Sequence, residues 1–415
     1  MIGFFSELLY RLFYPLLILF HKQGGYSKDA ISLKKGLVKL ENNDNRKVIM
    51  FHGVSVGEVN AIEKLIRKSR EEFPQAKIVI TTGTNTGQEI AHKKLDDVVD
   101  LVTYFPFDTP SCVNRFLDNI KPDLILITET EIWPNIANEC KKRGIKLCII
   151  NGRISDRTYK SYKALKLFFK PLLNKYTGIY TQSTEDLEKF LSLGTNPETT
   201  NRMNNLKFDI TAPEITFDFD KSGKVLLAAS THTGEDEIVL SVYDRLKKSN
   251  KHNNLKLIIA PRHLTRKDEV EKLVGESGYT YGFRSEGISS LADIDILILD
   301  TMGELGKMFA YSDISFIGGS FNKTGGHNPL ESIIFSKPVI SGPSIHNFKD
   351  IYAIIKNAKA GFVVKTENEF FDIADKLLSN DKFYSETAQA GNDVFKSQQG
   401  ALNYVINIIR DYLKL

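Results

Sequence analysis

The 415-residue sequence has few cysteines, one tryptophan, no low-complexity tract and no internal repeat. Its three cysteines, Cys112, Cys140 and Cys148, lack the paired spacing of a zinc site, and an odd number cannot form a complete disulfide framework. We therefore expect reduced thiols in a cytoplasmic environment. A content of 42% hydrophobic and 26% charged residues indicates a folded globular protein rather than a disordered one.

A strong net charge is also lacking, because 55 Lys and Arg residues face 51 Asp and Glu residues. The first 50 residues hold eight basic and four acidic residues, so the net charge of +4 lies at the N-terminus. Residues 1–21 are apolar but interrupted by Glu7, Arg11 and Pro15, whereas a spanning helix needs about 20 apolar residues. We expect a shallow membrane anchor and no nucleic-acid binding. A helix packed on the protein's own core and a single membrane span are the alternatives.

Short apolar runs alternate with helical patterns along most of the chain. The runs of the first half are 48–51, 77–80, 101–104, 123–127, 146–150 and 178–181. The runs of the second half are 224–229, 255–260, 294–299, 314–317 and 338–340. Strands without polar alternation, separated by helices, are typical of parallel sheets covered on both faces. The sequence therefore predicts an α/β protein with two doubly wound, Rossmann-like domains.

The chain is too long for one ordinary core, and a segment without helical period separates the two series of runs. The expected organisation is a membrane anchor over 1–21, a first domain over 22–209, a linker over 210–221, a second domain over 222–395, and a C-terminal helix over 396–415 able to return to the first domain. Ligands of open parallel sheets lie beyond the carboxyl ends of the strands. We expect the two domains to face a cleft, with the chemistry in those loops.

A glycine-rich stretch over residues 314–331 reads as a strand, a flexible loop and a helix with Pro329 in its first turn. Its two glycine pairs let backbone approach a ligand, and the helix start suits a phosphate. Glu331 could accept both hydroxyls of a ribose. The stretch matches neither the dinucleotide fingerprint nor the phosphate loop, so an ordinary turn is the alternative. The paired glycines are Gly318, Gly319, Gly325 and Gly326.

Carboxylates follow two strands of the first half. Ser55 and Glu58 have the spacing of a capping box, so starting a helix is one possible role for both. Because flexible Gly57 lies beside Glu58 at the carboxyl end of a strand, we favour Glu58 as a general base. Glu129 and Glu131 alternate in an extended segment and would point to the same side, where each could feel the other's charge. Surface exposure of this pair is the alternative.

Cationic side chains follow other strands, and together they suggest an anionic ligand. Arg153 follows the run 146–150, and arginine forks suit carboxylates and phosphates. Lys207 lies just before the linker. In the second half, the segments Ser230-Thr231-His232 and Pro261-Arg262-His263 follow strands and would join His327 near the glycine loop.

A metal site is not the favoured interpretation of these groups. The three histidines come from three separate loops, without the paired spacing of a zinc site. Asp293-Ile294-Asp295 imitates a cation-binding Asp-x-Asp element, but it leads directly into an apolar run and reads as the start of a strand. We therefore predict phosphate and sugar binding, with no metal.

Taken in order, these motifs resemble the family of Kdo transferases, membrane-associated enzymes that attach 3-deoxy-D-manno-oct-2-ulosonic acid (Kdo) to lipid A precursor. The resemblance covers nearly the whole chain. It rests on the apolar N-terminus and on the segments 54–59, 129–135, 205–209, 300–305 and 325–331. Asn204 stands where the family usually has glycine, and Gly152 where it usually has alanine.

The resemblance implies a GT-B glycosyltransferase with CMP-Kdo as donor and a tetraacylated lipid A precursor as acceptor, in lipopolysaccharide biosynthesis. It implies an inverting transfer in which Glu58 takes a proton from the acceptor's 6′-hydroxyl, with Glu129 and Glu131 also in the catalytic site. No cofactor is implied. The implied acceptor-binding residues are Ser55, Gly57 and Arg153. The implied donor-binding residues are Lys207, Ser230, Thr231, His232, Pro261, Arg262, His263, Met302, Gly303, Glu304, Gly318, Gly319, Ser320, Gly325, Gly326, His327, Asn328 and Glu331.

The implied location is the cytoplasmic face of the inner membrane, reached through residues 1–21. Three alternatives remain open at this point. The chain could be another GT-B sugar-nucleotide transferase, or a sugar-nucleotide epimerase, although an epimerase has no use for an apolar N-terminus. It could also be a non-catalytic, membrane-tethered binder of sugar nucleotides.

Overall fold

The computed structural model describes residues 25–42, 44–249 and 251–414, and the chain divides into two compact units. The first unit comprises residues 1–209 and 399–415, and the second comprises residues 210–398. The predicted anchor over residues 1–21 lies outside the described residues. No helix in the described part of the chain combines the length and the apolar character that crossing a membrane requires.

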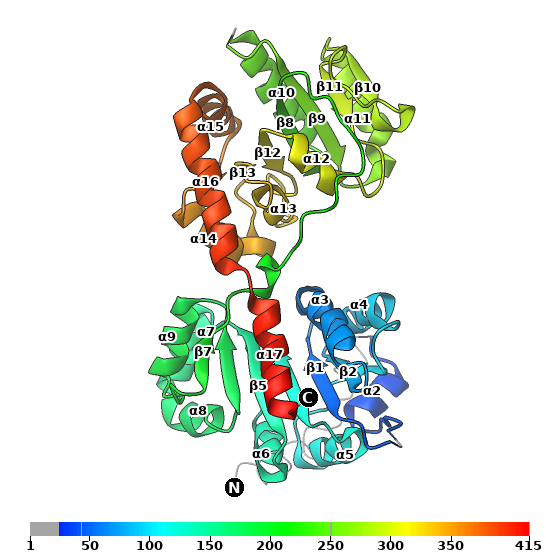
Figure 1. Cartoon of the computed structure of the whole chain (residues 1–415), viewed down its shortest axis with the longest axis vertical. Coiled ribbons are helices and arrows are strands. Elements are labelled where there is room, and N and C mark those ends of the chain that lie inside the picture. The colour runs from blue at the N-terminus through cyan, green and yellow to red at the C-terminus, as the bar shows by residue number, and fades with distance from the viewer. Residues whose placement is uncertain (1–24, 43, 250, 415) are drawn as a thin grey trace. The chain divides into compact units, whose positions relative to one another are not determined.

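The described strands of the first unit form one parallel sheet in the order β3-β2-β1-β4-β5-β6-β7 (Figure 1). These strands are β1 (Val48–His52), β2 (Lys77–Thr82), β3 (Leu101–Tyr104), β4 (Leu124–Thr128), β5 (Lys146–Gly152), β6 (Gly178–Thr181) and β7 (Thr200–Arg202). The helical segments of this unit are α2 (Lys28–Lys34), α3 (Val56–Glu72), α4 (Asn85–Leu95), α5 (Pro110–Ile120), α6 (Pro134–Arg143), α7 (Asp156–Ala164), α8 (Lys166–Leu173), α9 (Thr184–Ser192), η1 (Leu206–Phe208) and α17 (Ala401–Leu413).

The second unit repeats this architecture in the order β10-β11-β9-β8-β12-β13-β14. Its described strands are β8 (Lys224–Thr231), β9 (Leu255–Pro261), β10 (Tyr281–Phe283), β11 (Ile296–Ile298), β12 (Ile314–Ile317), β13 (Val339–Ser341) and β14 (Gly361–Val363). Its helical segments are α10 (Glu235–Lys248), η2 (Leu264–Arg266), α11 (Lys267–Glu276), η3 (Arg284–Glu286), α12 (Leu305–Tyr311), α13 (Leu330–Ile333), η4 (His346–Phe348), α14 (Lys349–Asn357), α15 (Glu367–Ser379) and α16 (Asp381–Gln398).

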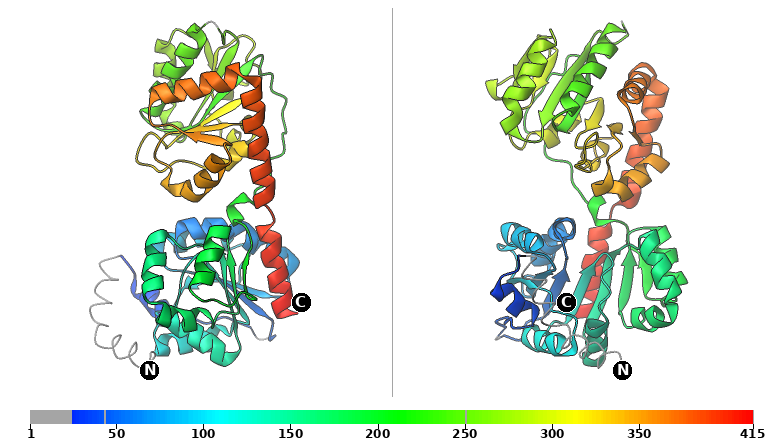
Figure 2. Two further views of the ribbon diagram at one scale, coloured as in Figure 1. Left: turned by 90° about the vertical axis from the view of Figure 1, so that its left-hand side faces the viewer. Right: turned by 180° about the vertical axis from the view of Figure 1, so that it is seen from behind.

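Apolar strands explain why helices cover both faces of each sheet (Figure 2). Every residue of β1 and β4 is buried, as expected for strands with no solvent-facing side. In the first unit, α3, α4 and α17 contribute to the core on one face of the sheet. Helices α5, α6, α8 and α9 contribute to the core on the other face. The predicted α/β doubly wound architecture is therefore confirmed.

Some details of the sequence prediction were wrong. The short strands β7, β10 and β14 were not predicted, because a three-residue strand at or near a sheet edge carries too little periodic signal. The segment between β5 and β6 forms two helices, α7 and α8, which meet at Leu165.

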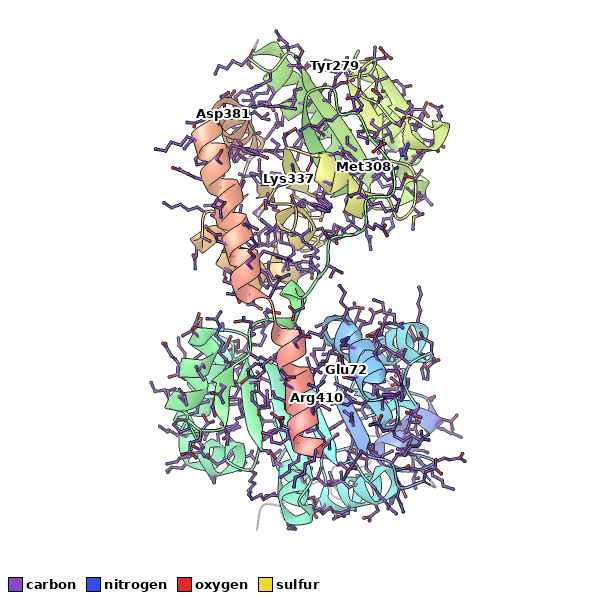
Figure 3. The ribbon with its side chains drawn as sticks, viewed as in Figure 1. Glu72, Tyr279, Met308, Lys337, Asp381 and Arg410 are labelled. Carbon is purple, nitrogen blue, oxygen red and sulfur yellow. The ribbon has the colours of Figure 1, made fainter. Side chains whose placement is uncertain are left out.

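The C-terminal helix α17 packs on the first unit although the whole second unit precedes it in the chain. Ile409 is completely buried against the first sheet. Arg410 forms an ion pair with Glu72 of α3 at 3.1 Å (Figure 3), and the hydroxyls of Tyr412 and Tyr180 lie 2.8 Å apart. The first unit is therefore completed by the last residues of the chain.

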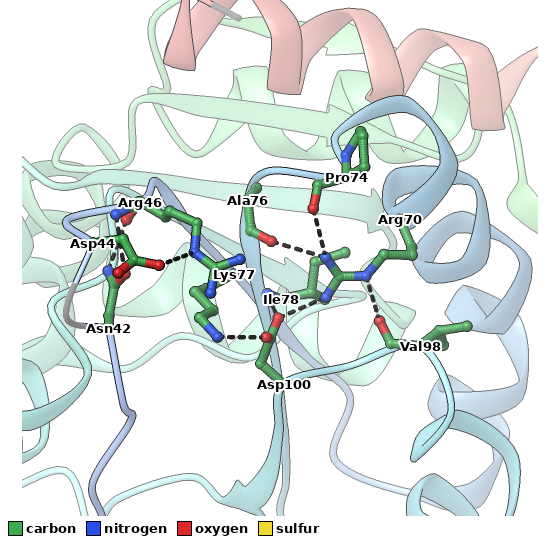
Figure 4. Close-up of polar contacts among 10 residues, drawn as sticks. All are labelled: Asn42, Asp44, Arg46, Arg70, Pro74, Ala76, Lys77, Ile78, Val98 and Asp100. Atoms are coloured by element: carbon green, nitrogen blue, oxygen red, sulfur yellow. Dashed lines mark hydrogen bonds and ion pairs between the residues drawn. The ribbon is translucent and has the colours of Figure 1, made fainter.

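The amino ends of the first sheet are held by structural ion pairs (Figure 4). Asp100 accepts hydrogen bonds from Arg70 at 2.6 Å, from Lys77 at 2.8 Å and from the backbone N–H of Ile78 at 2.8 Å. Arg70 also donates to the carbonyl oxygen of Val98. These charged groups already bind one another or the backbone of the same unit. We therefore expect the chemistry at the carboxyl ends of the strands.

The contribution of α17 is testable with two neighbouring substitutions. Ile409→Ala should lower the free energy of unfolding of the first unit by about 2–5 kcal/mol, because it leaves a cavity in a closed core. Arg410→Ala should cost about 1 kcal/mol or less, because an exposed ion pair contributes little. Urea unfolding followed through the fluorescence of Trp133, the only tryptophan, reports on this unit. Equal losses for the two variants would contradict the packing described here.

Candidate functional site

Several candidate residues of each unit follow the two strands at which the strand order reverses. In the first sheet β1 lies beside β4, and in the second sheet β8 lies beside β12. Such switch points open a crevice at the carboxyl ends, where ligands of doubly wound sheets bind. Each unit therefore has its own candidate site, at the switch point of its sheet.

Glu58 lies in the first turn of α3, close to the end of β1. The backbone N–H of Val54 donates to Oε2 of Glu58 at 2.5 Å, and the Ser55 hydroxyl lies 3.4 Å from Oε1. The side chain of Ser55 makes no capping bond, and the intervening Gly57 is exposed. Glu58 therefore binds one backbone N–H at the start of the helix and still keeps acceptor sites. Its contact with the helix start and a role as general base do not exclude each other.

The surroundings of Glu58 disfavour its ionised form. Burial raises the pKa of Glu58 to about 7, and the negative charges of Glu129 and Glu131 act in the same direction. The N–H of Val54 partly opposes this shift in the pKa. A carboxyl group with a pKa near neutrality can exchange a proton with a bound hydroxyl under physiological conditions.

Val54, whose N–H binds Glu58, is linked through its carbonyl group and Gly83 to a buried lysine. The carbonyl oxygen of Val54 accepts the N–H of Gly83 at 3.0 Å, and the carbonyl oxygen of Gly83 accepts a hydrogen bond from Lys34 at 2.9 Å. Lys34 is only 6% exposed, and its burial lowers the pKa of the ammonium group to about 8. Lys34 is thus connected to Glu58 through hydrogen bonds of the backbone of Gly83 and Val54.

Sequence reasoning missed Lys34 because no motif surrounds it. Its ammonium group lies over the rings of Tyr26 and Tyr104, at 4.9 and 5.1 Å from their centroids. Desolvated cations gain from aromatic faces in this way. The single signal in the sequence is a lysine at the end of a short helix, which is also common on protein surfaces.

Glu129 and Glu131 lie in the loop after β4, next to β1 in the sheet. Glu129 has a φ of 62°, a conformation that is costly for a residue with a side chain and often marks functional sites. Its carboxylate lies 3.9 Å from Nε of Arg153. Burial, followed by the charge of Glu129, raises the pKa of Glu131. The structure therefore brings the three predicted catalytic carboxylates into one electrostatic cluster, with Arg153 at its edge.

Lys207, which the family resemblance places on the donor side, belongs to the first unit. It lies in η1, where its backbone N–H donates to Oδ1 of Asn205 at 3.0 Å, and the N–H of Leu206 donates to Asn151 at 3.0 Å. Asn204, just before this turn, has a φ of 71°. Asparagine tolerates this left-handed conformation better than most residues, so it can replace glycine here.

In the second unit, a buried carboxylate organises the glycine loop. Glu235, at the start of α10, is 1% exposed. It accepts the N–H groups of Gly319 at 2.7 Å, of Ser320 at 2.8 Å and of Phe321 at 2.8 Å. It also accepts the N–H of His232 at 3.0 Å. The loop after β12 is thus fixed to the loop after β8 by one side chain.

This contact corrects the interpretation of the first glycine pair. The N–H groups of Gly319 and Ser320 are already bound by Glu235, so they are not open to a phosphate. Gly318 is needed for another reason, because a Cβ there would collide with the carbonyl oxygen of Ser230. Ser230 has a φ of 56°, and the following Thr231 is completely buried. The backbones of Gly318, Ser230 and Thr231 therefore lie in close contact at the switch point of the second sheet.

Three imidazoles and a guanidinium gather at the same edge. The Nε2 atoms of His232 and His327 lie 2.9 Å apart, so one ring donates and the other accepts. The ring centroid of His263 lies 5.8 Å from that of His232. Burial lowers the pKa of His327 to about 4, with the charge of Arg262 as the second cause. Burial raises the pKa of Glu331, and Arg262 opposes that shift. Arg262 therefore acts electrostatically on both His327 and Glu331.

The second glycine pair shapes the end of this loop. Gly325 and Gly326 have φ values of 98° and 77°, which favour glycine. A Cβ on Gly325 would collide with the ring of His346. Oδ1 of Asn328 accepts the N–H of Leu330 at 3.1 Å, at the start of the four-residue α13.

The remaining candidates of the second unit differ in their surroundings. Met302 is 83% exposed, and Gly303 has a φ of 81°. Glu304 accepts hydrogen bonds from Arg284 at 2.9 and 3.1 Å, so its carboxylate already has a structural partner. Pro261 is buried at the end of β9.

The Asp-x-Asp pattern is the start of a strand, as expected. Asp295 precedes β11, forms an ion pair with Lys247 at 3.0 Å and accepts the hydroxyl of Thr280 at 3.0 Å. Across the described residues, no group of three or more His, Cys, Asp or Glu side chains is placed to hold a metal ion.

The fold of the chain is similar to those of a solved epimerase and a solved glycosyltransferase. UDP-GlcNAc 2-epimerase from Neisseria meningitidis, solved with UDP-GlcNAc, is similar with a TM-score of 0.56 and 13% identity, covering 88% of this chain and all of that chain. A glycosyltransferase from Rickettsia africae is similar with a TM-score of 0.50 and 13% identity, covering 89% of this chain and 99% of that chain. The two parallel sheets therefore define the GT-B class of α/β proteins.

The sequence comparisons are more specific. A family model described as 3-deoxy-D-manno-octulosonic-acid transferase (kdotransferase) matches residues 30–210. The 3-deoxy-D-manno-octulosonic acid transferase of Haemophilus influenzae is 32% identical over 375 residues, covering 88% of this chain and 87% of the relative. The chain therefore belongs to the Kdo transferase family of glycosyltransferases. A bifunctional glycosyltransferase/methyltransferase of Fusobacterium nucleatum is 37% identical over 391 residues, and the match spans 89% of this chain but 59% of that protein.

The role of Glu235 is testable against a neighbour in the same helical turn. Glu235→Ala leaves backbone donors without their partner, and each buried unsatisfied donor costs about 1–3 kcal/mol. The variant should unfold at lower denaturant concentration, and amides 319–321 should exchange hydrogen faster in the native state. Glu237→Ala removes an exposed carboxylate of the same helix and should change neither. Unchanged exchange at 319–321 in Glu235→Ala would contradict this role.

Proposed function

We propose that this protein transfers Kdo from CMP-Kdo to the 6′-hydroxyl of lipid A precursor, in lipopolysaccharide biosynthesis, at the cytoplasmic face of the inner membrane. Membership of the Kdo transferase family supports the sugar and the class of reaction. The observation that carries the mechanism is the position of Glu58. It combines a half-buried carboxyl group, a pKa raised to about 7 and a place at the switch point of the first sheet.

In the proposed mechanism, the acceptor hydroxyl oxygen attacks the anomeric carbon of Kdo in one displacement. The bond from that carbon to the phosphate oxygen of CMP breaks, CMP keeps the electron pair, and the anomeric configuration inverts. The hydroxyl proton passes to Glu58, which must therefore be ionised when the acceptor binds. Glu129 and Glu131 keep the pKa of Glu58 high enough for the carboxylate to be an effective base.

The second unit would bind the donor. Arg262 would supply a positive charge, and the three imidazoles would supply hydrogen-bonding nitrogens, for the phosphate and carboxylate of CMP-Kdo. A bound phosphate would raise the pKa of His232 and His327, which burial now lowers. Glu331 would accept the ribose hydroxyls, and Lys207 of the first unit would contribute a further positive charge toward the leaving phosphate.

The acceptor would bind through Ser55, Gly57 and Arg153 of the first unit. Arg153 lies at the edge of the carboxylate cluster, where its guanidinium could meet a phosphate of the lipid. Residues 1–21 would hold the enzyme at the membrane, so that the acyl chains of the acceptor stay in the bilayer during transfer.

The identity of the base is tested with Glu58→Gln. We expect transfer of Kdo to tetraacylated lipid A precursor, followed by mass spectrometry of the lipid, to fall by about 10²–10⁴-fold. Binding of CMP should be unchanged. Glu71→Gln, on the exposed part of the same helix, should keep full activity. Full activity of Glu58→Gln would rule out Glu58 as base. A wild-type protein that binds CMP-Kdo without forming product would be a binder, and one that alters the free sugar nucleotide would be an epimerase.

The pH dependence of kcat/KM tests the carboxylate cluster. Activity should fall as the pH drops through about 7, because Glu58 then takes up a proton. Glu129→Gln removes a negative charge that disfavours ionisation of Glu58. The pKa of Glu58 should therefore decrease in this variant, and the acidic limb of the kcat/KM profile should move to lower pH. An unmoved acidic limb in this variant would show that the two carboxylates do not interact.

A further inference from the structure

Helices α7 and α8 carry an exposed apolar group that packing does not explain. No residue of α7 is buried, and α8 buries only Leu172 and Leu173. Where the two helices meet, Leu165 is 59% exposed and Leu167 is 96% exposed. Phe168 is 40% exposed. The other large apolar side chains found exposed in the described part of the chain are far apart in sequence.

The same segment is strongly basic. Residues 157–175 contain six Lys and Arg residues and no Asp or Glu. These cations are Arg157, Lys160, Lys163, Lys166, Lys170 and Lys175. Lys163, Lys166 and Lys170 are exposed and flank the apolar residues in sequence. We call Leu165, Leu167 and Phe168, with these three lysines, the α7–α8 surface.

The α7–α8 surface has a firm base in the first unit. The rings of Tyr162 and Phe169 stack with centroids 4.0 Å apart, and both pack against the core. These inward-facing rings supply most of the packing, whereas Leu167 is almost fully exposed and Phe168, which meets Phe169 edge-on with centroids 5.3 Å apart, keeps part of its ring exposed. Packing within the first unit therefore does not explain why these apolar side chains are exposed. Exposed apolar groups of this kind often mark interaction sites.

The chemistry of the surface favours one occupant. Exposed aliphatic and aromatic side chains flanked by lysines are typical of segments that lie in the interface of an anionic bilayer. A stable protein partner would need about 1,000 Å² of buried surface, whereas this apolar group lies within four consecutive residues. Lysine side chains can also extend their charged ends to the headgroups while their stems accompany the apolar residues.

The surface is also close to the candidate site in the chain. Helix α7 begins two residues after Ile154, directly behind the loop that carries Arg153. Tyr162, on α7, is near enough to Glu131 for that charge to contribute to the raised pKa of its hydroxyl, after burial. A bilayer at the α7–α8 surface would therefore be near the carboxylate cluster of the first unit.

We propose that the α7–α8 surface binds the interface of an anionic bilayer, as a second membrane contact besides residues 1–21. The inference rests on the proposed function for its purpose, because a lipid-borne acceptor is reached only at a membrane. Leu165, Leu167 and Phe168 enter the headgroup region, and the lysines contact anionic lipid.

The test uses the full chain with an environment-sensitive fluorophore on a single introduced cysteine. Cys112, Cys140 and Cys148 are buried, so labelling will favour the new thiol. Leu167→Cys places the dye on the α7–α8 surface. Lys64→Cys, on the exposed side of α3 at the opposite face of the sheet, is the matched control. Each protein is mixed with phosphatidylglycerol vesicles or with phosphatidylcholine vesicles, and vesicle binding is measured separately by co-sedimentation.

We expect the dye at position 167 to shift to shorter wavelength and to brighten several-fold with phosphatidylglycerol vesicles only, while the dye at position 64 stays unchanged. Lys163→Gln with Lys166→Gln should weaken this response. No response at position 167, whether or not the protein sediments with vesicles, would overturn the proposal. A dye already shielded before vesicles are added would also overturn it, because a second copy or residues 1–21 would then cover the surface. The dye response needs no turnover, so failure of Kdo transfer would leave this result standing.

Discussion

The binding of backbone N–H groups by a carboxylate of the same chain is the interaction on which the candidate site depends. Glu235 holds the N–H groups of Gly319, Ser320 and Phe321, and so joins the loops after β8 and β12. A buried carboxylate is costly unless hydrogen bonds compensate for the lost water. Four backbone donors supply that compensation here. The loops at the switch point are therefore fixed by the chain itself, and the side chains that these loops carry have a firm support.

The first unit uses the same device with a different outcome. Glu58 also lies in the first helical turn after the first strand of its sheet, but it receives only one backbone N–H, from Val54. With less compensation and with Glu129 and Glu131 nearby, its pKa rises to about 7. Two glutamates in corresponding places thus differ in chemistry because of the number of donors that surround them. Glu235 is a structural carboxylate, and Glu58 keeps the capacity to accept a proton.

The sequence was sufficient for the architecture and for most members of the candidate site. Buried parallel strands are continuous apolar runs, and the loops behind them identified Glu58, Glu129, His232 and Arg262 without coordinates. The role of Glu235 could not be predicted, because its partners lie more than eighty residues away along the chain and a glutamate at a helix start has an ordinary explanation. The buried position of Lys34 was hidden for the same reason, since its partner, the carbonyl oxygen of Gly83, lies 49 residues away along the chain.

Strained backbone supports the assignment of the edge where chemistry occurs. Glu129, Asn151 and Ser230 have φ values of 62°, 51° and 56°, and each lies at or just after the carboxyl end of a strand. Such conformations persist only where the surrounding structure enforces them, and they are frequent at ligand sites. At the amino ends of the first sheet, Asp100 instead binds Arg70 and Lys77 in ordinary ion pairs. The two edges of the first sheet therefore differ, since the amino ends carry paired charges while the carboxyl ends carry strained backbone and the carboxylate cluster.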